Sequence, residues 1–417
     1  MKRYCAATSV ILILATTALL AAGADAAKDW PQWRGPKRDG VSTETGLLKQ
    51  WPAGGPTLVW TAKGLGEGYS GPAIVGGKLY TMGDVGGSAS VLCLDAATGK
   101  QVWIAKVGKP GGGGGYPGPR CTPTVDGGLV FALAQFGELV CVQAATGQPV
   151  WSKSLTADFR GGVPGWGYAE SPLVDGPLVV ATPGGRGGAM AALNKTTGAV
   201  VWRSTGFNDG AHYSSAIVAE IGGVRQYIQL TADSVTGVAA TNGQVLWRAP
   251  RKGQTAVVPT PVYADNEVFV TSGYNVGHNA FKISGSGGHF SAAPLYEGKD
   301  ITNHHGGVVL VGQHLYGHSD SGGWTCMDFK TGKVVWKNGG VGKGSVVCAD
   351  GHLYTRSEGP KGTIALVEAS PDGYKEHGRF DQPDRSGKNS WPHPVVCGGK
   401  LYIRDQDVLL CYDVKAK

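Results

Sequence analysis

The chain has 417 residues, of which 69 are Gly and 12 are Trp, and only 17% are charged. This composition disfavours a helical protein, because Gly costs about 1 kcal/mol relative to Ala at each interior position of a helix. The formal charge of +7 is modest, and no runs of Lys and Arg stand out, which argues against nucleic-acid binding.

Residues 1–26 have the features of a secretory signal peptide. A basic start at Lys2 and Arg3 precedes an apolar run over residues 10–22 and the small-residue ending Ala24-Asp25-Ala26. The run is too short to span a bilayer comfortably, and no later segment approaches 18 apolar residues. We predict an exported protein, periplasmic or extracellular, with no transmembrane segment and no lipid-anchor cysteine after the signal peptide.

One short pattern then recurs along the chain, and its copies share a turn with Gly followed by a strand that ends in Trp. The clear copies are DAATGKQVW (95–103), QAATGQPVW (143–151), NKTTGAVVW (194–202), AATNGQVLW (239–247) and DFKTGKVVW (328–336). The last two Trp residues are 89 positions apart, almost two periods, so a degenerate copy should end near Tyr296. Such self-similarity indicates a propeller or a solenoid.

Each repeat also has a front half, in which a short apolar strand, a Gly/Asp/Asn turn and an alternating second strand follow one another. Together the two halves give four antiparallel strands, which is one propeller blade. We therefore predict an all-β fold, a single eight-bladed β-propeller over residues 56–417. The blades are predicted to begin near Gly71, Thr122, Ser171, Ser214, Thr260, Gly307, Ser345 and His393.

The eighth blade ends after residues 409–417 without a fourth strand. The segment PTLVWTAKG (56–64) resembles the missing strand, with Trp60 matching Trp103. An N-terminal strand should therefore close the ring, which removes open sheet edges. In each repeat the Gly supplies a positive φ in the turn, and the flat Trp ring suits packing between neighbouring blades.

Residues 27–55 precede the first strand and are predicted to be an N-terminal extension that packs on the propeller. Within WPQWRG (30–35), Trp30 and Trp33 could cover one mouth of the channel with Arg34 pointing into it, or the segment could pack against the wall. The sequence leaves both arrangements open.

Seven cysteines follow the signal peptide, an odd number that cannot all pair within one molecule. Cys93, Cys141 and Cys326 each stand six residues before the Gly of a repeat turn, and Cys411 occupies the matching place in the last repeat. This spacing favours small buried strand residues over disulfides or metal ligands.

The Thr-Gly…Trp turn repeats over residues 56–417 resemble those of the PQQ-like (pyrroloquinoline-quinone-like) β-propellers. This group contains quinoprotein alcohol dehydrogenases and an outer-membrane assembly propeller. The opening DWPQWRGPKRDGVS (29–42) and NHHGG (303–307) look like secreted bacterial members of the group. The resemblance implies the propeller fold, and it implies a ligand site where the loops between blades gather round one mouth of the channel.

The loops expected at that mouth carry cationic, aromatic and imidazole side chains beyond what turns require. Besides Tyr69 and Tyr116, the predicted ligand-binding residues are Arg120, Arg160, Trp166, Tyr168, Glu170, His212, Tyr213, Lys252, Asn303, His304, His305, Lys343, Trp391 and His393. Loops are often polar for solubility alone, and Trp166 and Trp391 could simply cap the core.

If the resemblance extended to the cofactor, PQQ with Ca²⁺ would be held by Arg or Lys partners, a flat aromatic ring and hard oxygen ligands. The chain departs from the dehydrogenase pattern in three respects. It has no adjacent Cys-Cys pair, no evident Asp beside Asn303 to act as the base, and fewer residues than the full dehydrogenases.

Two further motifs are explained by the repeat. His314 and His318 fall on a predicted strand, where four residues span about 13 Å, so they cannot share one metal ion, and no metal site is predicted. The run SDSGG (319–323) joins two strands of blade six and is predicted to be a hairpin turn.

The leading functional hypothesis is a cell-envelope binding or scaffold propeller, not an enzyme, that recognises a partner protein, a polymer or a small anionic ligand at the channel mouth. The alternative is a PQQ-dependent alcohol or sugar oxidoreductase. A hydrolase or lyase is a third option, with Glu67, Glu170, Asp209 and Asp300 as candidate acids by location alone.

Overall fold

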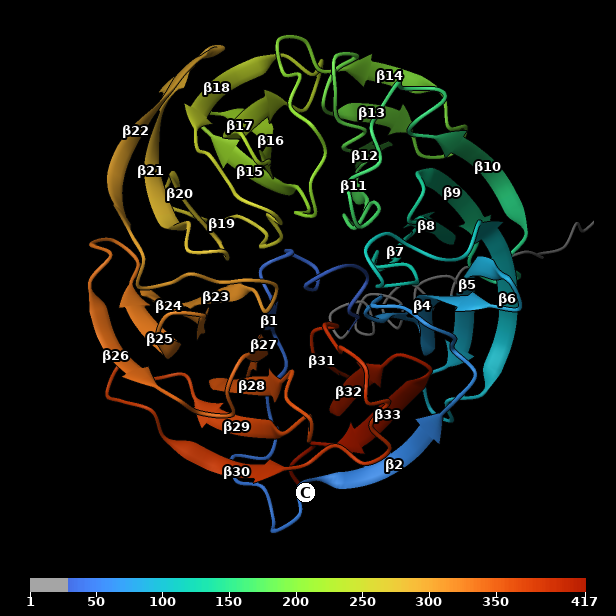
Figure 1. Cartoon of the computed structure of the whole chain (residues 1–417), viewed down its shortest axis with the longest axis vertical. Helices are drawn as coiled ribbons and strands as arrows, with labels where there is room; N and C mark the ends of the chain where they lie inside the picture. The colour runs from blue at the N-terminus through green and yellow to red at the C-terminus, as the bar shows by residue number, and fades with distance from the viewer. Residues whose placement is uncertain (1–28) are drawn as a thin grey trace, which may run out of the picture.

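Each repeat folds into a four-stranded antiparallel sheet, and eight sheets stand side by side in a ring (Figure 1). The computed structural model describes residues 29–417, and the predicted signal peptide at residues 1–26 lies outside them. Within residues 29–417 all regular elements are strands, and no helix is long and apolar enough to cross a bilayer. The predicted eight-bladed all-β propeller is confirmed.

The first four blades run in chain order from the inner to the outer strand of each. They consist of β3 (Ala73–Val75), β4 (Lys78–Val85), β5 (Ser88–Asp95) and β6 (Gln101–Gly108); β7 (Thr124–Asp126), β8 (Leu129–Leu133), β9 (Glu138–Gln143) and β10 (Pro149–Ser154); β11 (Leu173–Asp175), β12 (Leu178–Ala181), β13 (Ala191–Asn194) and β14 (Val200–Arg203); and β15 (Ile217–Ile221), β16 (Val224–Leu230), β17 (Ser234–Ala239) and β18 (Val245–Pro250).

The last four blades include the two strands that come from the N-terminal part of the chain. They consist of β19 (Val262–Ala264), β20 (Glu267–Ser272), β21 (Gly277–Ser286) and β22 (His289–Gly298); β23 (Val308–Val311), β24 (His314–Ser319), β25 (Gly323–Asp328) and β26 (Val334–Asn338); β27 (Gly344–Ala349), β28 (His352–Ser357), β29 (Ile364–Glu368) and β30 (Glu376–Phe380) with β1 (Val41–Ser42) beside β27; and β31 (Val395–Cys397), β32 (Lys400–Asp405) and β33 (Val408–Asp413) with β2 (Thr57–Ala62) as outer strand.

The repeated Gly and Trp form a lock between consecutive blades. The indole N–H of Trp103, on the outer strand of blade one, donates to the carbonyl of Ala144 in the turn of blade two at 3.0 Å. Gly147 of that turn has a φ of +71°, and a Cβ there would lie 2.6 Å from the Trp103 ring. The Gly is therefore required both for the turn and for the approach of the Trp. The same contact recurs for Trp60 on Gly99, Trp151 on Gly198 and Trp202 on Gly243.

In the degenerate repeat, a Tyr ring takes the place of the Trp ring in this lock. Tyr296 on β22 donates its hydroxyl hydrogen to the carbonyl of Phe329 and lies against Gly332, as the sequence spacing predicted. Trp247 on β18 departs from the pattern, because its N–H donates to the side chain of Gln226 in its own blade at 2.8 Å.

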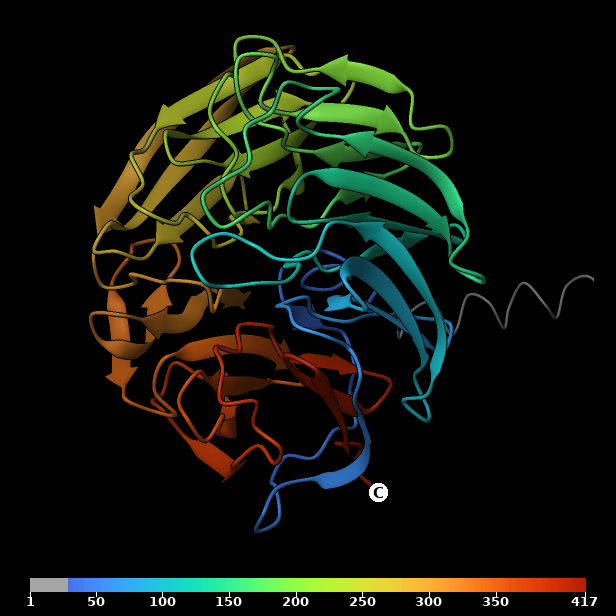
Figure 2. The same cartoon turned by 45° about the vertical axis from the view of Figure 1, so that its right-hand side comes forward.

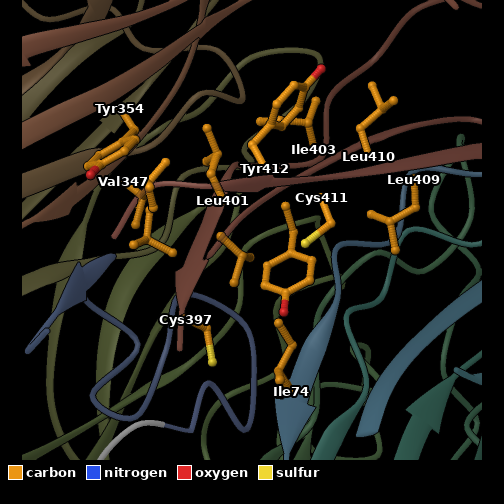
Figure 3. Close-up of a cluster of buried hydrophobic side chains, with 14 of the residues drawn as sticks. Ile74, Val347, Tyr354, Cys397, Leu401, Ile403, Leu409, Leu410, Cys411 and Tyr412 are labelled. Carbon is orange, nitrogen blue, oxygen red and sulfur yellow. The ribbon is translucent and has the colours of Figure 1, made fainter. Parts of the chain in front are cut away.

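The ring is closed by the N-terminal strand, as predicted. Strand β2 pairs antiparallel with β33, placing Trp60 opposite Cys411, and the C-terminus lies beside β2 in Figure 1. The closing blade is held by a buried apolar cluster that joins Leu401 and Leu409 to Val347 of blade seven and to Ile74 of blade one (Figure 3). The closing blade is thus packed against both of its neighbours.

The described N-terminal segment crosses the middle of the ring (Figures 1 and 2). We call residues 30–42 the channel plug. Trp30 exchanges two backbone hydrogen bonds with Ile74 at 2.8 Å each, and β1 pairs parallel with β27. Buried Arg34 donates to the carbonyl of Val308 at 2.6 Å, and buried Arg38 donates to the carbonyl of Ser171 at 2.7 Å. The plug therefore binds the inner edges of several blades.

The cysteines that the repeat placed on strands lie there. Cys93, Cys141, Cys326 and Cys411 are on the third strands of their blades and almost fully buried, and none of these four forms a disulfide. The SDSGG segment forms the hairpin between β24 and β25, and His314 and His318 lie on β24, so the predicted turn and the predicted strand are confirmed.

Candidate functional site

One end of the propeller carries a cavity of about 210 Å³. Because the strands of a blade are antiparallel, the loops from an outer strand to the next blade and the hairpins between second and third strands emerge at the same end. Seven of the eight inter-blade loops contribute to the cavity, together with one hairpin and the plug. Its lining residues are Trp33, Tyr69, Tyr116, Arg120, Trp166, Ala169, Ser171, Tyr213, Ser215, Ala256, Val258, Tyr274, His304, His305 and Trp391.

Much of the lining is a continuous series of touching rings, which we call the aromatic collar: Tyr69, Trp391, His305, His304 and Tyr274. Tyr69 stacks on Trp391 with ring centroids 4.5 Å apart, and His305 lies 4.8 Å from Trp391. His304 stacks on His305 at 4.1 Å and meets Tyr274 edge-on at 4.6 Å. Tyr116 also contacts Trp391, at 5.2 Å. Aromatic packing of this kind fixes the rings relative to one another.

The two His residues of the collar are held from behind by charged groups. The Nδ1 of His304 lies 2.6 Å from the ammonium of Lys343, and its Nε2 lies 3.0 Å from the hydroxyl of Tyr274. Burial, together with the electrostatic influence of His305 and Lys343, lowers the pKa of His304 to about 3, so this imidazole is neutral at physiological pH. The Nδ1 of His305 lies 2.7 Å from a carboxylate oxygen of Glu358.

Arg120 is the one charged side chain of the lining. Its guanidinium donates to the carbonyls of Gly118 and Tyr116 at 2.7 and 2.6 Å and lies 5.2 Å from the centre of the Tyr69 ring. Burial lowers the pKa of Arg120. Much of its hydrogen-bonding capacity therefore holds the loop, and only the remainder can face a ligand.

The plug contributes Trp33 to the cavity. Its indole N–H donates to the hydroxyl of Thr260 at 2.9 Å, and its ring lies 4.5 Å from that of His393. Of the two arrangements that the sequence left open, Trp33 therefore takes the one at the channel mouth. Trp30 instead is buried against blade one.

The structure brings six of the fourteen predicted residues to the cavity wall and places eight elsewhere. The six are Arg120, Trp166, Tyr213, His304, His305 and Trp391. Lys343 and His393 stand directly behind collar residues, since His393 Nε2 lies 2.8 Å from the carbonyl oxygen of His305. Arg160 and Lys252 are exposed to solvent outside the lining.

The other four predicted residues hold the framework. Asn303 is buried and bonds the backbone of Gly307 and His318, and Tyr168 donates to the carbonyl of Pro183 at 2.8 Å. The ring nitrogen Nδ1 of His212 accepts the N–H of Val257 at 3.3 Å. These contacts are what buried polar groups require.

Glu170 is a fully buried acid between the plug and blade three. It accepts the backbone N–H of Thr182 and a side-chain N–H of Gln229 at 3.4 Å. Burial raises the pKa of Glu170 to about 7, opposed in part by Arg38. Its neighbours along the chain, Ala169 and Ser171, line the cavity, so side chains alternate between cavity and interior in this segment.

Tyr274 lines the cavity but was not among the residues predicted from the sequence. It belongs to the hairpin between β20 and β21, whereas the predicted residues all come from loops between blades. The antiparallel order of the strands already implies that these hairpins share the mouth, and that signal would have indicated Tyr274. It would also have indicated Asp320 and Glu358, which follow second strands and contact His304 and His305.

The residues of the cavity do not fit PQQ with Ca²⁺. The cofactor's three carboxylates need several cationic partners, and the lining offers Arg120 alone. A calcium ion needs hard oxygen ligands, and no carboxylate lines the cavity. Within residues 29–417 no group of three His, Cys, Asp or Glu side chains is placed to hold a metal ion.

The four candidate acids for a hydrolase do not lie together at the cavity either. Glu67 pairs with Lys388, Asp300 pairs with Lys337 at 2.8 Å, Asp209 is buried beside Arg248 and Glu170 is buried as described above. A carboxylate pair across one site, which glycoside hydrolysis requires, is not formed by these four.

Known proteins with related sequences and folds agree with this architecture. The family model for outer membrane protein assembly factor BamB matches residues 49–135 and 87–338. The chain is 26% identical over 284 residues to outer membrane protein assembly factor BamB of Burkholderia pseudomallei, covering 57% of this chain and 71% of that protein. It is 29% identical over 167 residues to the serine/threonine-protein kinase AfsK of Streptomyces griseus, covering 39% of this chain and 19% of the kinase.

Among solved structures, the quinohemoprotein alcohol dehydrogenase ADHIIG of Pseudomonas putida superposes with a TM-score of 0.65 at 14% identity, covering 97% of this chain and 82% of the dehydrogenase. At this identity the likeness concerns the fold alone. The family match extends over more than half of the chain and agrees with the blade-by-blade locks. The chain belongs to the PQQ-like β-propeller family of outer membrane protein assembly factor BamB.

Proposed function

We propose that this protein is a binding propeller of the cell envelope whose ligand, or an anchoring group of a partner, enters the cavity at the channel mouth. The observation that carries the proposal is the aromatic collar, because rings from loops far apart in sequence converge on one hollow. The locks between consecutive blades use other residues, such as Trp103 on Gly147 and Trp151 on Gly198, so the collar rings are not part of them.

The size of the cavity supports recognition of a single ring-sized group. An apolar cavity of about 150 Å³ is enough to bind benzene, whereas sites that enclose a whole drug-sized ligand measure about 300–1,000 Å³. At about 210 Å³ the cavity would bury one ring, while the rest of the ligand would lie across the loops. Anchor pockets at binding surfaces work in this way.

An envelope role is supported by the kinship with outer membrane protein assembly factor BamB and by the predicted signal peptide. Oxidoreductase activity with PQQ is the competing function. It is supported by the fold likeness to an alcohol dehydrogenase and disfavoured by the hydrogen-bond donors and ligand atoms that the cavity offers.

The test uses the 12 Trp residues of the chain as reporters. The mature protein is labelled with 5-fluorotryptophan, and each ¹⁹F resonance is assigned with a Trp→Phe variant. Small ring compounds, a Tyr-containing peptide and PQQ with Ca²⁺ are then added separately. We expect saturable shifts at Trp33, Trp166 and Trp391, which line the cavity, and none at the blade-locking Trp103 and Trp151, which serve as internal controls.

The outcomes separate the two functions. Saturable shifts with any of the organic ring probes, without dye-linked oxidation of alcohols, support the binding propeller. Shifts with PQQ and Ca²⁺ accompanied by turnover would replace it with the oxidoreductase. If no probe moves the cavity resonances, the proposed function is wrong.

A matched pair of glycine variants gives a second test of the same cavity. A Cβ added to Gly114 would lie 2.3 Å from the Trp166 indole nitrogen, whereas one added to Gly115 would meet nothing within 4 Å, and both residues have positive φ. Gly114→Ala should therefore shift the Trp166 resonance and weaken binding of the probes, while Gly115→Ala should do neither. Equal effects of the two variants would contradict a role for Trp166 in the cavity.

A further inference from the structure

We infer that the ring bound in the cavity is a neutral sugar, the terminal pyranose of a glycan. This inference rests on the proposed function and names the ligand class of the same site. It is carried by three properties of the cavity, which are its aromatic walls, the hydrogen-bond donors set into them and the balance of charge around them.

The walls suit the faces of a pyranose. A pyranose ring presents C–H groups on its faces, and the face of an aromatic ring carries the negative part of its quadrupole, which attracts the positive C–H groups. The collar supplies Tyr274, 36% exposed, next to His304 and His305, and Trp166 with Tyr213 supplies a second pair of rings 5.8 Å apart. A ring-sized ligand in this volume contacts aromatic surface.

The hydrogen-bond direction along the collar can be worked out from Lys343. An ammonium group only donates, so at 2.6 Å it donates to His304 Nδ1. The neutral imidazole then carries its hydrogen on Nε2 and donates it to the oxygen of Tyr274, 3.0 Å away. The hydroxyl hydrogen of Tyr274 is left to donate to another acceptor, such as a sugar oxygen.

One serine hydroxyl of the lining is in the same condition. Ser215 Oγ accepts the backbone N–H of Ser171 at 2.9 Å, which does not use its hydroxyl hydrogen, so it can donate one more bond. Ser171 Oγ accepts the backbone N–H of Thr122 at 2.9 Å and also interacts with the Cys121 thiol. His305 directs Nδ1 to Glu358, which leaves Nε2 as its ring nitrogen for a ligand. Sugar hydroxyls both accept and donate, so they can pair with these groups whichever role each takes.

Charge argues for a neutral ligand. The cations next to the collar are Arg120, Lys343 and Lys388, and each has a carboxylate close by, namely Asp84, Asp320 and Glu67 respectively. Glu358 adds a further negative group behind His305. Each cation next to the collar is therefore offset by a carboxylate, which weakens the attraction for an anion, and a cation would meet Arg120 in the wall. An apolar side chain would leave the Ser and Tyr donors unpaired, which costs about 1–3 kcal/mol for each buried group.

The test compares pyranoses of similar size and different charge. Methyl β-glucoside and N-acetylglucosamine are the neutral probes, glucuronate is the anionic one and glucosamine the cationic one. Binding is followed through the ¹⁹F resonances of Trp391 and Trp166, with Trp103 as reference. We expect saturable binding of a neutral pyranose and at least a several-fold weaker binding of the charged analogues.

Tyr274→Phe tests the donor assigned to the collar. Loss of one hydrogen bond to a neutral ligand should weaken binding of the neutral pyranose by about 5–10-fold, while binding of indole, which needs only the rings, should be unchanged. Tyr263→Phe is the matched control, because the hydroxyl of Tyr263 bonds the Glu220 carbonyl outside the cavity. It should leave both affinities at the wild-type value.

The failures are distinguishable. If indole or the Tyr-containing peptide moves the cavity resonances and no pyranose does, the sugar assignment is wrong and the binding propeller stands. If glucuronate binds more tightly than the neutral sugars, the charge argument is wrong. If no probe moves them, both the assignment and the proposed function fail.

Discussion

Replacing Glu170 by Gln is expected to stabilise the protein at and above neutral pH and to change little in acid. The carboxyl is fully buried beside the plug residue Arg38, and burial raises its pKa from 4.5 to about 7. The folded protein therefore keeps the proton up to about pH 7, whereas the unfolded chain releases it near pH 4.5. The wild type loses stability as the pH rises through this interval, because the unfolded state then binds fewer protons.

The size of the effect follows from the width of the interval. One pKa unit corresponds to about 1.4 kcal/mol, so the fully developed penalty is about 3 kcal/mol. Gln has nearly the same shape, keeps an acceptor for the Thr182 N–H and does not ionise. Relative to wild type, Glu170→Gln should gain about 2–3 kcal/mol more stability at pH 8 than at pH 5.

Urea unfolding of both proteins at the two pH values measures this difference directly. Glu297→Gln is the control, since Glu297 is exposed on β22 and bonds only the side chain of Asn279, and its effect should be small at both pH values. A stability difference for Glu170→Gln that is the same at pH 5 and pH 8 would refute the assignment of Glu170 as a buried protonated acid.

Two other predictions concern the locks of the ring and the plug. Gly147→Ala should destabilise the protein by about 2 kcal/mol more than Gly127→Ala. Both residues have positive φ, but only Gly147 lies against a Trp ring, that of Trp103. Equal urea midpoints for the two variants would contradict the lock. Arg38→Met should lower the free energy of unfolding by about 2–4 kcal/mol, because it leaves the buried carbonyls of Ser171 and Pro172 without their charged donor. It should also speed proteolysis of residues 29–42. Unchanged stability would show that the plug is not held by this contact.

The ring was predictable from the sequence because its determinants repeat. Gly at a fixed offset from Trp marks every clear copy, and even the degenerate copy could be located by period, with Tyr296 in the place of Trp. What the pattern did not reveal is that the Gly of one blade receives the Trp of the blade before it. That contact joins two repeats, and no single copy of the motif contains it.

The plug was only partly predictable. Residues 30–42 occur once, so no period specifies their structure, and their partners are backbone carbonyls and inner-strand edges of distant blades. The sequence could identify Trp33 and Arg34 as candidates for the channel but could not choose between the mouth and the wall. The parallel strand β1 beside β27 was not predicted for the same reason.

The position of the cavity was easier to predict than the residues that line it. A prediction from loop position alone includes neighbouring residues that point to opposite sides of an extended segment, although only one side can face the cavity. Ala169 and Ser171 face it whereas Glu170 is buried, and His304 and His305 face it whereas Asn303 holds the loop. Burial of the intervening residue depends on packing between blades, which loop composition does not encode.

The most direct test is a crystal structure of the mature protein soaked with methyl β-glucoside. We expect density for one pyranose within the collar, in contact with Trp391 and accepting a hydrogen bond from the Tyr274 hydroxyl. A sugar bound only elsewhere on the propeller, or an empty cavity at saturating sugar, would contradict it.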